Sequence, residues 1–140
     1  MKDRFFLDTN VFVYSFDHTA RKKAARAKNL IREALDTQKG ITSYQVAQEF
    51  FNVALKRFVR PMRAAEADQY LGKVFRPLMA VHSSMALYSD ALRIHTQSGL
   101  SWFDSLIVGA AQQAGCDVLY SEDMQHGQRF GDLRVVNPFL

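Results

Sequence analysis

The order of apolar and polar residues shows two kinds of pattern, which follow one another in turn along the chain. Short runs in which every residue is apolar, such as Phe5–Leu7, are typical of strands buried on both faces of a parallel sheet. Longer stretches with apolar residues three and four positions apart are typical of amphipathic helices. The pattern predicts strands at residues 5–7, 41–43, 78–82, 117–121 and 133–136, and helices at residues 11–16, 20–36, 44–59, 63–75, 83–99 and 101–115.

The alternation of strands with helices predicts the fold class. It indicates one α/β domain over residues 1–140, with a central, mainly parallel β-sheet flanked by α-helices. Two helices are expected to end before Pro61 and Pro77, because proline disfavours helical geometry in the preceding residue. Right-handed crossovers place the carboxyl ends of parallel strands at one edge of the sheet. Residues that follow the strands are therefore expected to lie near one another.

Four acidic residues are expected at that edge. Asp8 follows the first strand and Asp123 follows the fourth, while Glu49 and Asp104 lie early in helices that begin there. An ionised carboxylate at the end of a buried strand is costly unless something compensates its charge. The same edge is where open α/β sheets bind ligands. The sequence thus predicts an acidic site.

Three of the four acids also have a simpler interpretation. Asp8, Thr9 or Asn10 can cap the helix that follows the first strand. Glu49 lies at the border of an apolar helix face and can reach water through its flexible stem. Asp104 falls in a first helical turn, where the helix macrodipole favours an acid. If each acid had only such a local role, nothing would explain why all four approach the same edge of the sheet.

The crowding of carboxylates limits which ligands such a site can bind and which reactions it can catalyse. They resist ionisation unless a cation is present, and hard oxygen ligands suit Mg²⁺ or Mn²⁺. Such ions lower the pKa of bound water and neutralise charge on a phosphodiester. The four histidines show no zinc-like spacing, the glycines form no phosphate-binding loop, and Cys116 is expected in the core.

The composition of the chain indicates mainly which kinds of partner the protein favours and where it acts. The formal net charge of +4 mildly favours a polyanion. A basic face on the helix at 20–36 is usually a solvated face, and its alternative is a contact with RNA phosphates or an acidic protein. The residues of that face are Arg21, Lys22, Lys23 and Arg26. The single cysteine and the lack of a long apolar stretch lead us to expect a cytoplasmic protein with no membrane segment.

Four segments together resemble the motifs of PIN domains in their order along the chain. These segments are FLDTN at 6–10, SYQVAQEF at 43–50, WFDSLI at 102–107 and LYSED at 119–123. The resemblance implies that the catalytic, metal-binding acids are Asp8, Glu49, Asp104 and Asp123. The polar residues expected beside them are Thr9, Asn10, Ser43, Ser121 and Glu122. Since Glu122 and Asp123 are adjacent, strand alternation permits only one of them to face the metal, and the family pattern favours Asp123.

The resemblance also implies an activity. A single domain of this length is similar to VapC-type toxins, which are Mg²⁺-dependent endoribonucleases, often dimeric, restrained by a cognate antitoxin. We therefore expect Mg²⁺ or Mn²⁺ as cofactor, RNA as substrate, an antitoxin as partner and a homodimer as the assembly. The biological role stays open, because one fold with one site chemistry can serve several biological functions.

Several alternatives follow from the same residues. A PIN-fold nuclease can act on DNA or in RNA processing, and the sequence barely separates these from a toxin. A non-catalytic nucleic-acid-binding module is expected to have lost some of the four acids, whereas all four are present. A phospho-acceptor receiver domain is disfavoured because Asp8 is single, the third strand ends in His82, and no lysine follows residue 73.

Overall fold

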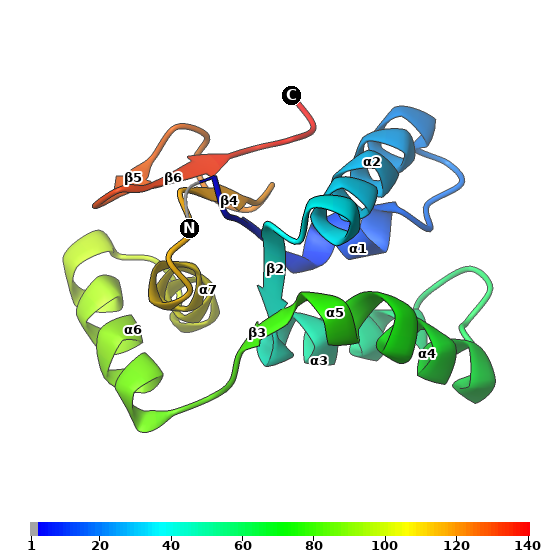
Figure 1. The fold of residues 1–140 in the computed structure, drawn as a ribbon, viewed down its shortest axis with the longest axis horizontal. Coiled ribbons are helices and arrows are strands. Elements are labelled where there is room, and N and C mark those ends of the chain that lie inside the picture. Colours follow the sequence, from blue (N-terminus) through cyan, green and yellow to red (C-terminus); the bar gives the residue numbers. More distant parts are fainter. Residues whose placement is uncertain (1–2) are drawn as a thin grey trace.

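Residues 3–140 are described here from a computed structural model, in which one sheet runs through the molecule (Figure 1). The order of its strands is β3-β2-β1-β4-β6-β5, and every neighbouring pair is parallel except β5 with β6. The strands are β1 (Phe5–Leu7), β2 (Gly40–Ser43), β3 (Met79–Val81), β4 (Val118–Tyr120), β5 (Arg129–Phe130) and β6 (Leu133–Val136). The predicted α/β fold class with a mainly parallel sheet is confirmed.

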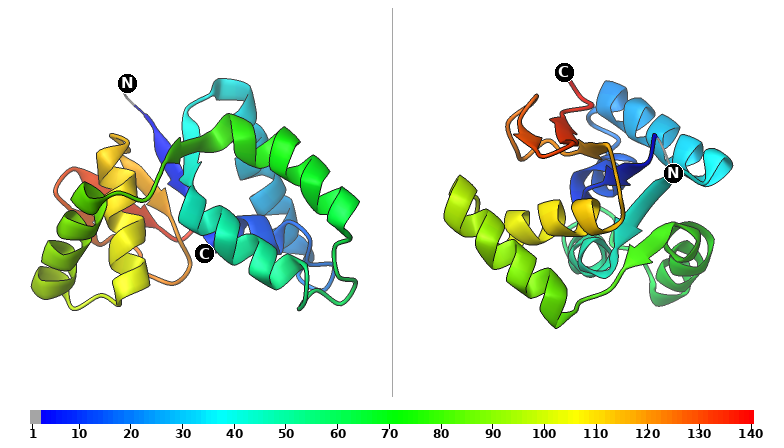
Figure 2. Two further views of the ribbon diagram at one scale, coloured as in Figure 1. Left: turned by 90° about the horizontal axis from the view of Figure 1, so that it is seen from below. Right: turned by 60° about the vertical axis from the view of Figure 1, so that its left-hand side comes forward.

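Helices cover both sides of the sheet. Helices α6 and α7 pack together on one side, and α1 to α5 lie on the other (Figures 1 and 2). Their bounds are α1 (Thr9–Tyr14), α2 (Arg21–Thr37), α3 (Tyr44–Ala54), α4 (Ala64–Tyr70), the π-helical segment η1 (Leu71–Phe75), α5 (Arg76–Leu78), α6 (Met85–Ser98) and α7 (Trp102–Gln113). This arrangement buries the central strands between two helical layers.

The core forms around β1 and an aromatic cluster beside it. Phe6 and Leu7 are fully buried, as expected for a continuous apolar run in a central strand. Phe12 and Phe50 lie 6.4 Å apart between ring centroids, in the edge-to-face geometry that aromatic pairs prefer. Cys116 is buried as predicted, and burial raises the pKa of its thiol to about 12.

Helix α3 is shorter than its sequence predicts. The apolar pattern predicts a helix to residue 59, but α3 ends at Ala54. The chain then folds back so that the ring of Phe58 packs 5.4 Å from Phe16 and 6.0 Å from Phe50. The N–H of Met62 donates a hydrogen bond to the carbonyl of Ala54 (2.9 Å) and closes this turn. Packing of an aromatic side chain outweighs continuation of the helix.

One further local prediction is wrong, and one short strand was not predicted. The helix at 63–75 does not stop before Pro77, because the chain passes through the π-helical segment η1 into α5. Pro77 stands in the first turn of α5, where its missing N–H is not required. The sequence does not predict strand β5, because two residues are too few to show an alternating pattern. Gly131 forms the turn before β6 with φ of 62°, a conformation that glycine adopts at little cost.

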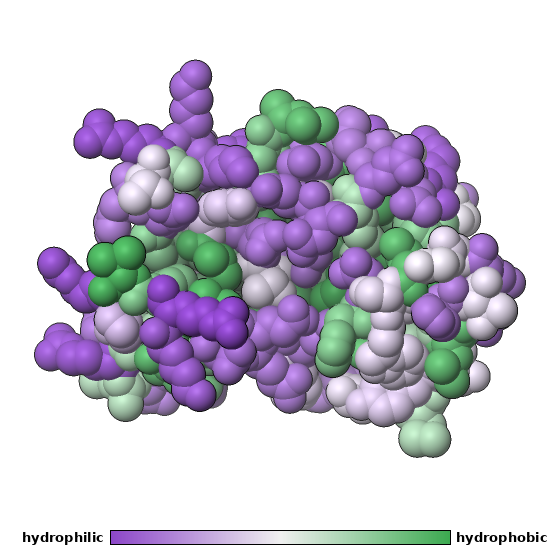
Figure 3. Space-filling model, turned by 180° about the vertical axis from the view of Figure 1, so that it is seen from behind, coloured by the Kyte–Doolittle hydropathy of each residue, from purple (hydrophilic) through white to green (hydrophobic). Residues whose placement is uncertain are grey.

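The molecular surface mixes polar and apolar residues. On the face opposite to that of Figure 1, apolar side chains form several small patches among hydrophilic ones (Figure 3). Large apolar side chains that are exposed include Val59, Met85 and Phe103. No helix within residues 3–140 is both long enough and apolar enough to cross a membrane.

Candidate active site

The acidic residues lie where the direction of strand order reverses. From β1 the chain crosses to β2 on one side, whereas β4 pairs with β1 on the other. Such a switch point leaves a crevice beyond the carboxyl ends of the two central strands. Asp8 follows β1 directly, and Ser121 and Asp123 follow β4. The topology therefore brings together residues that are far apart in the sequence.

Asp8 is the most deeply buried of the acids, with 4% of its surface exposed. Its Oδ1 accepts a hydrogen bond from the N–H of Thr9 (2.7 Å), and its Oδ2 accepts one from Ser121 Oγ (2.8 Å). Burial raises the pKa of Asp8 to about 7, against the lowering effect of these hydrogen bonds. The charges of Asp123 and Glu49 raise it further. Asp8 both caps α1 and faces β4.

Glu49 projects from α3 and is held by a glutamine one turn earlier. Gln45 Nε2 donates to Glu49 Oε1 (2.8 Å) and to the carbonyl oxygen of Phe103 (3.2 Å), which ties α3 to α7. Partial burial raises the pKa of Glu49, and the charges of Asp104 and Asp123 add to this effect. Glu49 therefore interacts with acids from two other elements.

Asp104 lies in the first turn of α7, as predicted. Its N–H donates to Ser101 Oγ (3.1 Å), so Ser101 caps this helix. Partial burial raises the pKa of the Asp104 carboxyl, and the charge of Asp123 raises it further. The structure thus brings Asp8, Glu49, Asp104 and Asp123 together, which we call the acid cluster. Four ion pairs form within residues 3–140, and none of them includes a member of the acid cluster.

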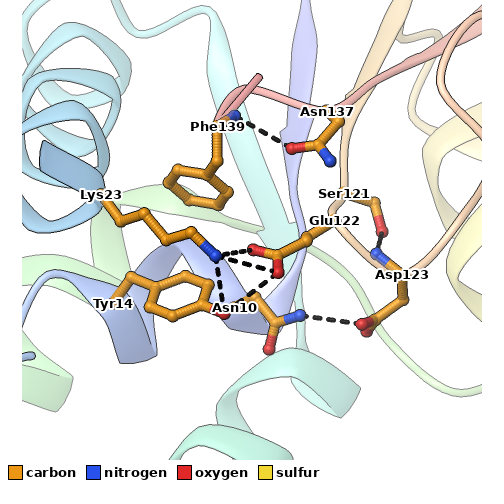
Figure 4. Close-up of polar contacts among 8 residues, drawn as sticks. All are labelled: Asn10, Tyr14, Lys23, Ser121, Glu122, Asp123, Asn137 and Phe139. Atoms are coloured by element: carbon orange, nitrogen blue, oxygen red, sulfur yellow. Dashed lines mark hydrogen bonds and ion pairs between the residues drawn. The ribbon is translucent and has the colours of Figure 1, made fainter. Parts of the chain in front are cut away.

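The adjacent carboxylates of Glu122 and Asp123 have different partners (Figure 4). Asp123 Oδ1 accepts a hydrogen bond from Asn10 Nδ2 (3.0 Å), at the start of α1. Glu122 instead accepts from the hydroxyl of Tyr14 (3.1 Å) and pairs with Lys23 Nζ (3.2 Å). Of the two, only Asp123 acts on the pKa of the other acids.

Two predicted supporting residues are buried next to the acid cluster. Thr9 Oγ1 has no hydrogen-bond partner among the described residues, although it is buried. Ser43 ends β2 and caps α3, where its Oγ accepts from the N–H of Val46 (3.5 Å). Ser43 therefore orients the helix that carries Glu49.

The basic face of α2 divides into two parts. Lys23 is paired with Glu122, and Arg26 Nε donates to the carbonyl oxygen of Pro138 (3.2 Å). Arg21 and Lys22 are exposed at the start of the helix. Arg26 is exposed as well, so Lys23 is the one of these four residues that is only partly exposed.

The donor set of the acid cluster suits a divalent cation. Its carboxylates are hard oxygen ligands, neighbouring acids help to raise the pKa of Asp8, Glu49 and Asp104, and the buried hydroxyl of Thr9 has no partner among the described residues. Within residues 3–140, no three His, Cys, Asp or Glu side chains converge closely enough to hold an ion by themselves. Water or substrate oxygens are needed to complete the coordination, as is common for Mg²⁺.

Sequence reasoning missed several residues that orient the acid cluster. Gln45 and Glu49 stand four residues apart in a helix, a spacing that predicts their contact. Tyr14 and the pairing of Lys23 with Glu122 carry no such signal, because they join segments that are far apart in the sequence.

An acid cluster at the switch point of a mainly parallel sheet defines an α/β protein with an acidic site between its central strands. The model of the PIN domain family matches residues 5–129, which is most of the chain. The chain belongs to the PIN domain family. No curated protein sequence matches it.

Solved structures share this fold at low sequence identity. A toxin–antitoxin complex from Klebsiella pneumoniae aligns with a TM-score of 0.66 and 16% identity, over 96% of this chain and 97% of the other. DNA-bound VapBC from Salmonella typhimurium aligns with a TM-score of 0.64 and 17% identity, over 95% and 96% of the two chains. VapC20 from Mycobacterium tuberculosis, described as a sarcin–ricin loop cleaving toxin, aligns with a TM-score of 0.58 and 20% identity, over 84% and 88%.

Proposed function

We propose that this protein is a metal-dependent endoribonuclease that uses Mg²⁺ or Mn²⁺ to hydrolyse RNA phosphodiesters. The observation that carries the proposal is the acid cluster around Asp8, in which the pKa values of Asp8, Glu49 and Asp104 are raised and no member forms an ion pair within residues 3–140. A cluster of this kind is stabilised by a cation of high charge density. The presence of all four acids disfavours a purely nucleic-acid-binding role.

The chain's own residues orient the cluster before any ligand binds. Ser121 and the N–H of Thr9 fix both oxygens of Asp8, and Asn10 fixes Asp123. Gln45 does the same for Glu49. A divalent cation at these carboxylates supplies positive charge that polarises a phosphodiester and activates water. Preorganised ligands lower the reorganisation needed during such a reaction.

The biological role that we propose is that of the toxin in a toxin–antitoxin pair, acting in the cytoplasm. Its support is the similarity of this fold to chains in the Klebsiella and Salmonella complexes, together with the PIN domain match. The partners in this proposal are a cognate antitoxin and a second copy of the same chain in a homodimer. The net charge of +4 suits an RNA substrate.

A cleavage assay tests the catalytic part of the proposal. We expect the purified protein to cleave single-stranded RNA in Mg²⁺ or Mn²⁺ and to stop cleaving in EDTA. The Asp8→Asn variant is expected to lose most activity while keeping the far-UV circular dichroism of the wild type. Asp36→Asn, an exposed acid near the end of α2, is the matched control and is expected to remain fully active. Full activity of Asp8→Asn would refute the mechanism, and cleavage of DNA alone would refute the substrate.

A further inference from the structure

The turn after β4 carries two adjacent carboxylates that face different neighbours. Ser121 and Asp123 face the acid cluster, since Ser121 Oγ donates to Asp8 (2.8 Å) and Asp123 accepts from Asn10 (3.0 Å). Glu122 stands between them and points toward α1 and α2 instead (Figure 4). This arrangement keeps one of two similar carboxylates out of the acid cluster.

Lys23, Tyr14 and Glu122 form a closed set of contacts, which we call the Glu122 clamp. Lys23 Nζ lies 3.2 Å and 3.4 Å from the two carboxylate oxygens of Glu122, and the hydroxyl of Tyr14 donates to Glu122 (3.1 Å). Lys23 also donates to that hydroxyl (3.4 Å). The side chains of Lys23 and Glu122 are 38% and 26% exposed, so water screens this pair less than a fully exposed one.

Aromatic rings hold the ammonium group of Lys23 in place. Its Nζ lies 4.6 Å from the ring centroid of Tyr14 and 5.8 Å from that of Phe139, within the range of cation–π attraction. The two rings contact each other edge to face, with centroids 5.0 Å apart. Arg26 fixes the segment that carries Phe139 through its bond to the carbonyl oxygen of Pro138. Lys23 is thus positioned from three separate parts of the chain.

The two carboxylates of the turn are held in different ways. Ser121 and Met124 are buried at either end, and Glu122 and Asp123 between them belong to no helix or strand. The N–H of Asp123 donates to Ser121 Oγ (3.3 Å), whereas Glu122 is held through its side chain by Tyr14 and Lys23. Without Lys23, an ionised Glu122 keeps the hydroxyl of Tyr14 and loses the cation that balances its charge.

We infer that Lys23 is a positioning residue, which holds Glu122 away from the acid cluster and thereby assigns the facing carboxylate of this turn to Asp123. The inference deepens the proposed function and rests on it for the effect on catalysis. The effect of Lys23 on the conformation of the turn can be measured whether or not the protein cleaves RNA.

The test compares Lys23→Met, Lys23→Arg and Lys28→Met, a control that removes an exposed charge from the same helix. Methionine keeps an unbranched side chain without the charge. We expect Lys23→Met to lower kcat on single-stranded RNA about tenfold with little change in KM, because a misdirected Glu122 would disturb the arrangement of the acids, and disturbed support of a metal site typically costs 10- to 100-fold. In EDTA, amide hydrogen exchange across residues 121–125 should become faster than in the wild type. Lys23→Arg should keep both properties close to those of the wild type, and Lys28→Met should change neither.

A double variant separates positioning from other roles of Lys23. Adding Glu122→Gln to Lys23→Met removes the misdirected charge and should recover at least half of the lost kcat on a logarithmic scale. No recovery, or unchanged amide exchange in Lys23→Met, would overturn the inference. A rise in KM with unchanged kcat and exchange would also overturn it and would assign Lys23 to RNA binding. If the wild type cleaves no RNA, the proposed function fails, and the exchange comparison still decides whether the clamp exists.

Discussion

Asp8 combines two roles that the sequence presents as alternatives. Its Oδ1 caps α1 through the N–H of Thr9, and its Oδ2 accepts from Ser121 across the sheet edge. The two oxygens of one carboxylate therefore serve local structure and the acid cluster at once. Asparagine is also a good helix cap, so Asp8→Asn removes the charge and largely keeps the cap.

The buried charge of Asp8 should make stability depend on pH. Its pKa is about 7 in the folded protein against an ordinary value of 3.8, so the folded state holds the proton more tightly than the unfolded chain. The stabilisation from this proton is complete below about pH 4 and is lost as pH rises toward 7. Thermal melts in EDTA should show Asp8→Asn gaining stability over the wild type across this range. A constant difference in melting temperature from pH 4 to pH 7.5 would contradict the raised pKa.

The adjacent acids should respond unequally to substitution. We expect Asp123→Asn to remove most RNA cleavage, because Asp123 acts on each of the other three acids. Glu122→Gln should cost much less, because an amide still accepts hydrogen bonds from Tyr14 and Lys23. The loss of activity in each variant is measured from steady-state cleavage rates in Mg²⁺, and circular dichroism checks that each variant is folded. A larger loss of RNA cleavage in Glu122→Gln than in Asp123→Asn would show that Glu122, and not Asp123, is the fourth acid of the site.

Elements with a strong local pattern were predictable from the sequence. β1 and α2 lie close to their predicted positions, because a continuous apolar run and a helical period both reflect burial directly. The premature end of α3 depends on a contact with a distant residue, Phe16, which no local pattern encodes. Strand β5 pairs with its neighbour β6, but its two residues are too few to show a pattern. The acid cluster was predictable because strand ends share one edge. The Glu122 clamp was not, because it joins three segments through side chains alone.

The exposed start of α2 allows a direct test of RNA binding. Since Lys23 pairs with Glu122 and Arg26 Nε bonds to Pro138, the exposed pair Arg21 and Lys22 is the simplest to substitute. A solvated basic face is the usual case, so we expect Arg21→Gln/Lys22→Gln to leave the salt dependence of RNA binding unchanged. Binding is measured in the Asp8→Asn background to prevent cleavage.

The matched control for this helix is Lys56→Gln/Arg57→Gln, which removes the same charge from exposed positions after α3. If α2 does bind the RNA backbone, the plot of log K against log salt should flatten by about one unit for each phosphate that the variant no longer neutralises. If only the α2 variant shows this change, the face binds RNA.

At the scale of the molecule, the acid cluster joins β1, α3, α7 and the turn after β4. Bound Mn²⁺ should therefore stabilise the whole fold, by about 2.7 kcal/mol at a free ion concentration 100 times the dissociation constant. Asp104→Asn should melt at a higher temperature than the wild type in EDTA, because it relieves repulsion, and should lose most of the increase caused by Mn²⁺. A purely capping Asp104 would leave the response to Mn²⁺ intact. Differential scanning calorimetry of the wild type and the variant, in EDTA and in Mn²⁺, measures these differences.

The pairing of β1 with β4 has a consequence for how the protein is made. Asp8 and its partner Ser121 are 113 positions apart, so a ribosome synthesises the first long before the second. Unfinished chains that end before β4 hold Asp8 without Ser121 or Asp123, and their first strand has a neighbour on one side only. The complete arrangement of acids forms only after β4 and the turn that follows it have been synthesised. Assembly of the site therefore comes well after synthesis of the strand that carries Asp8.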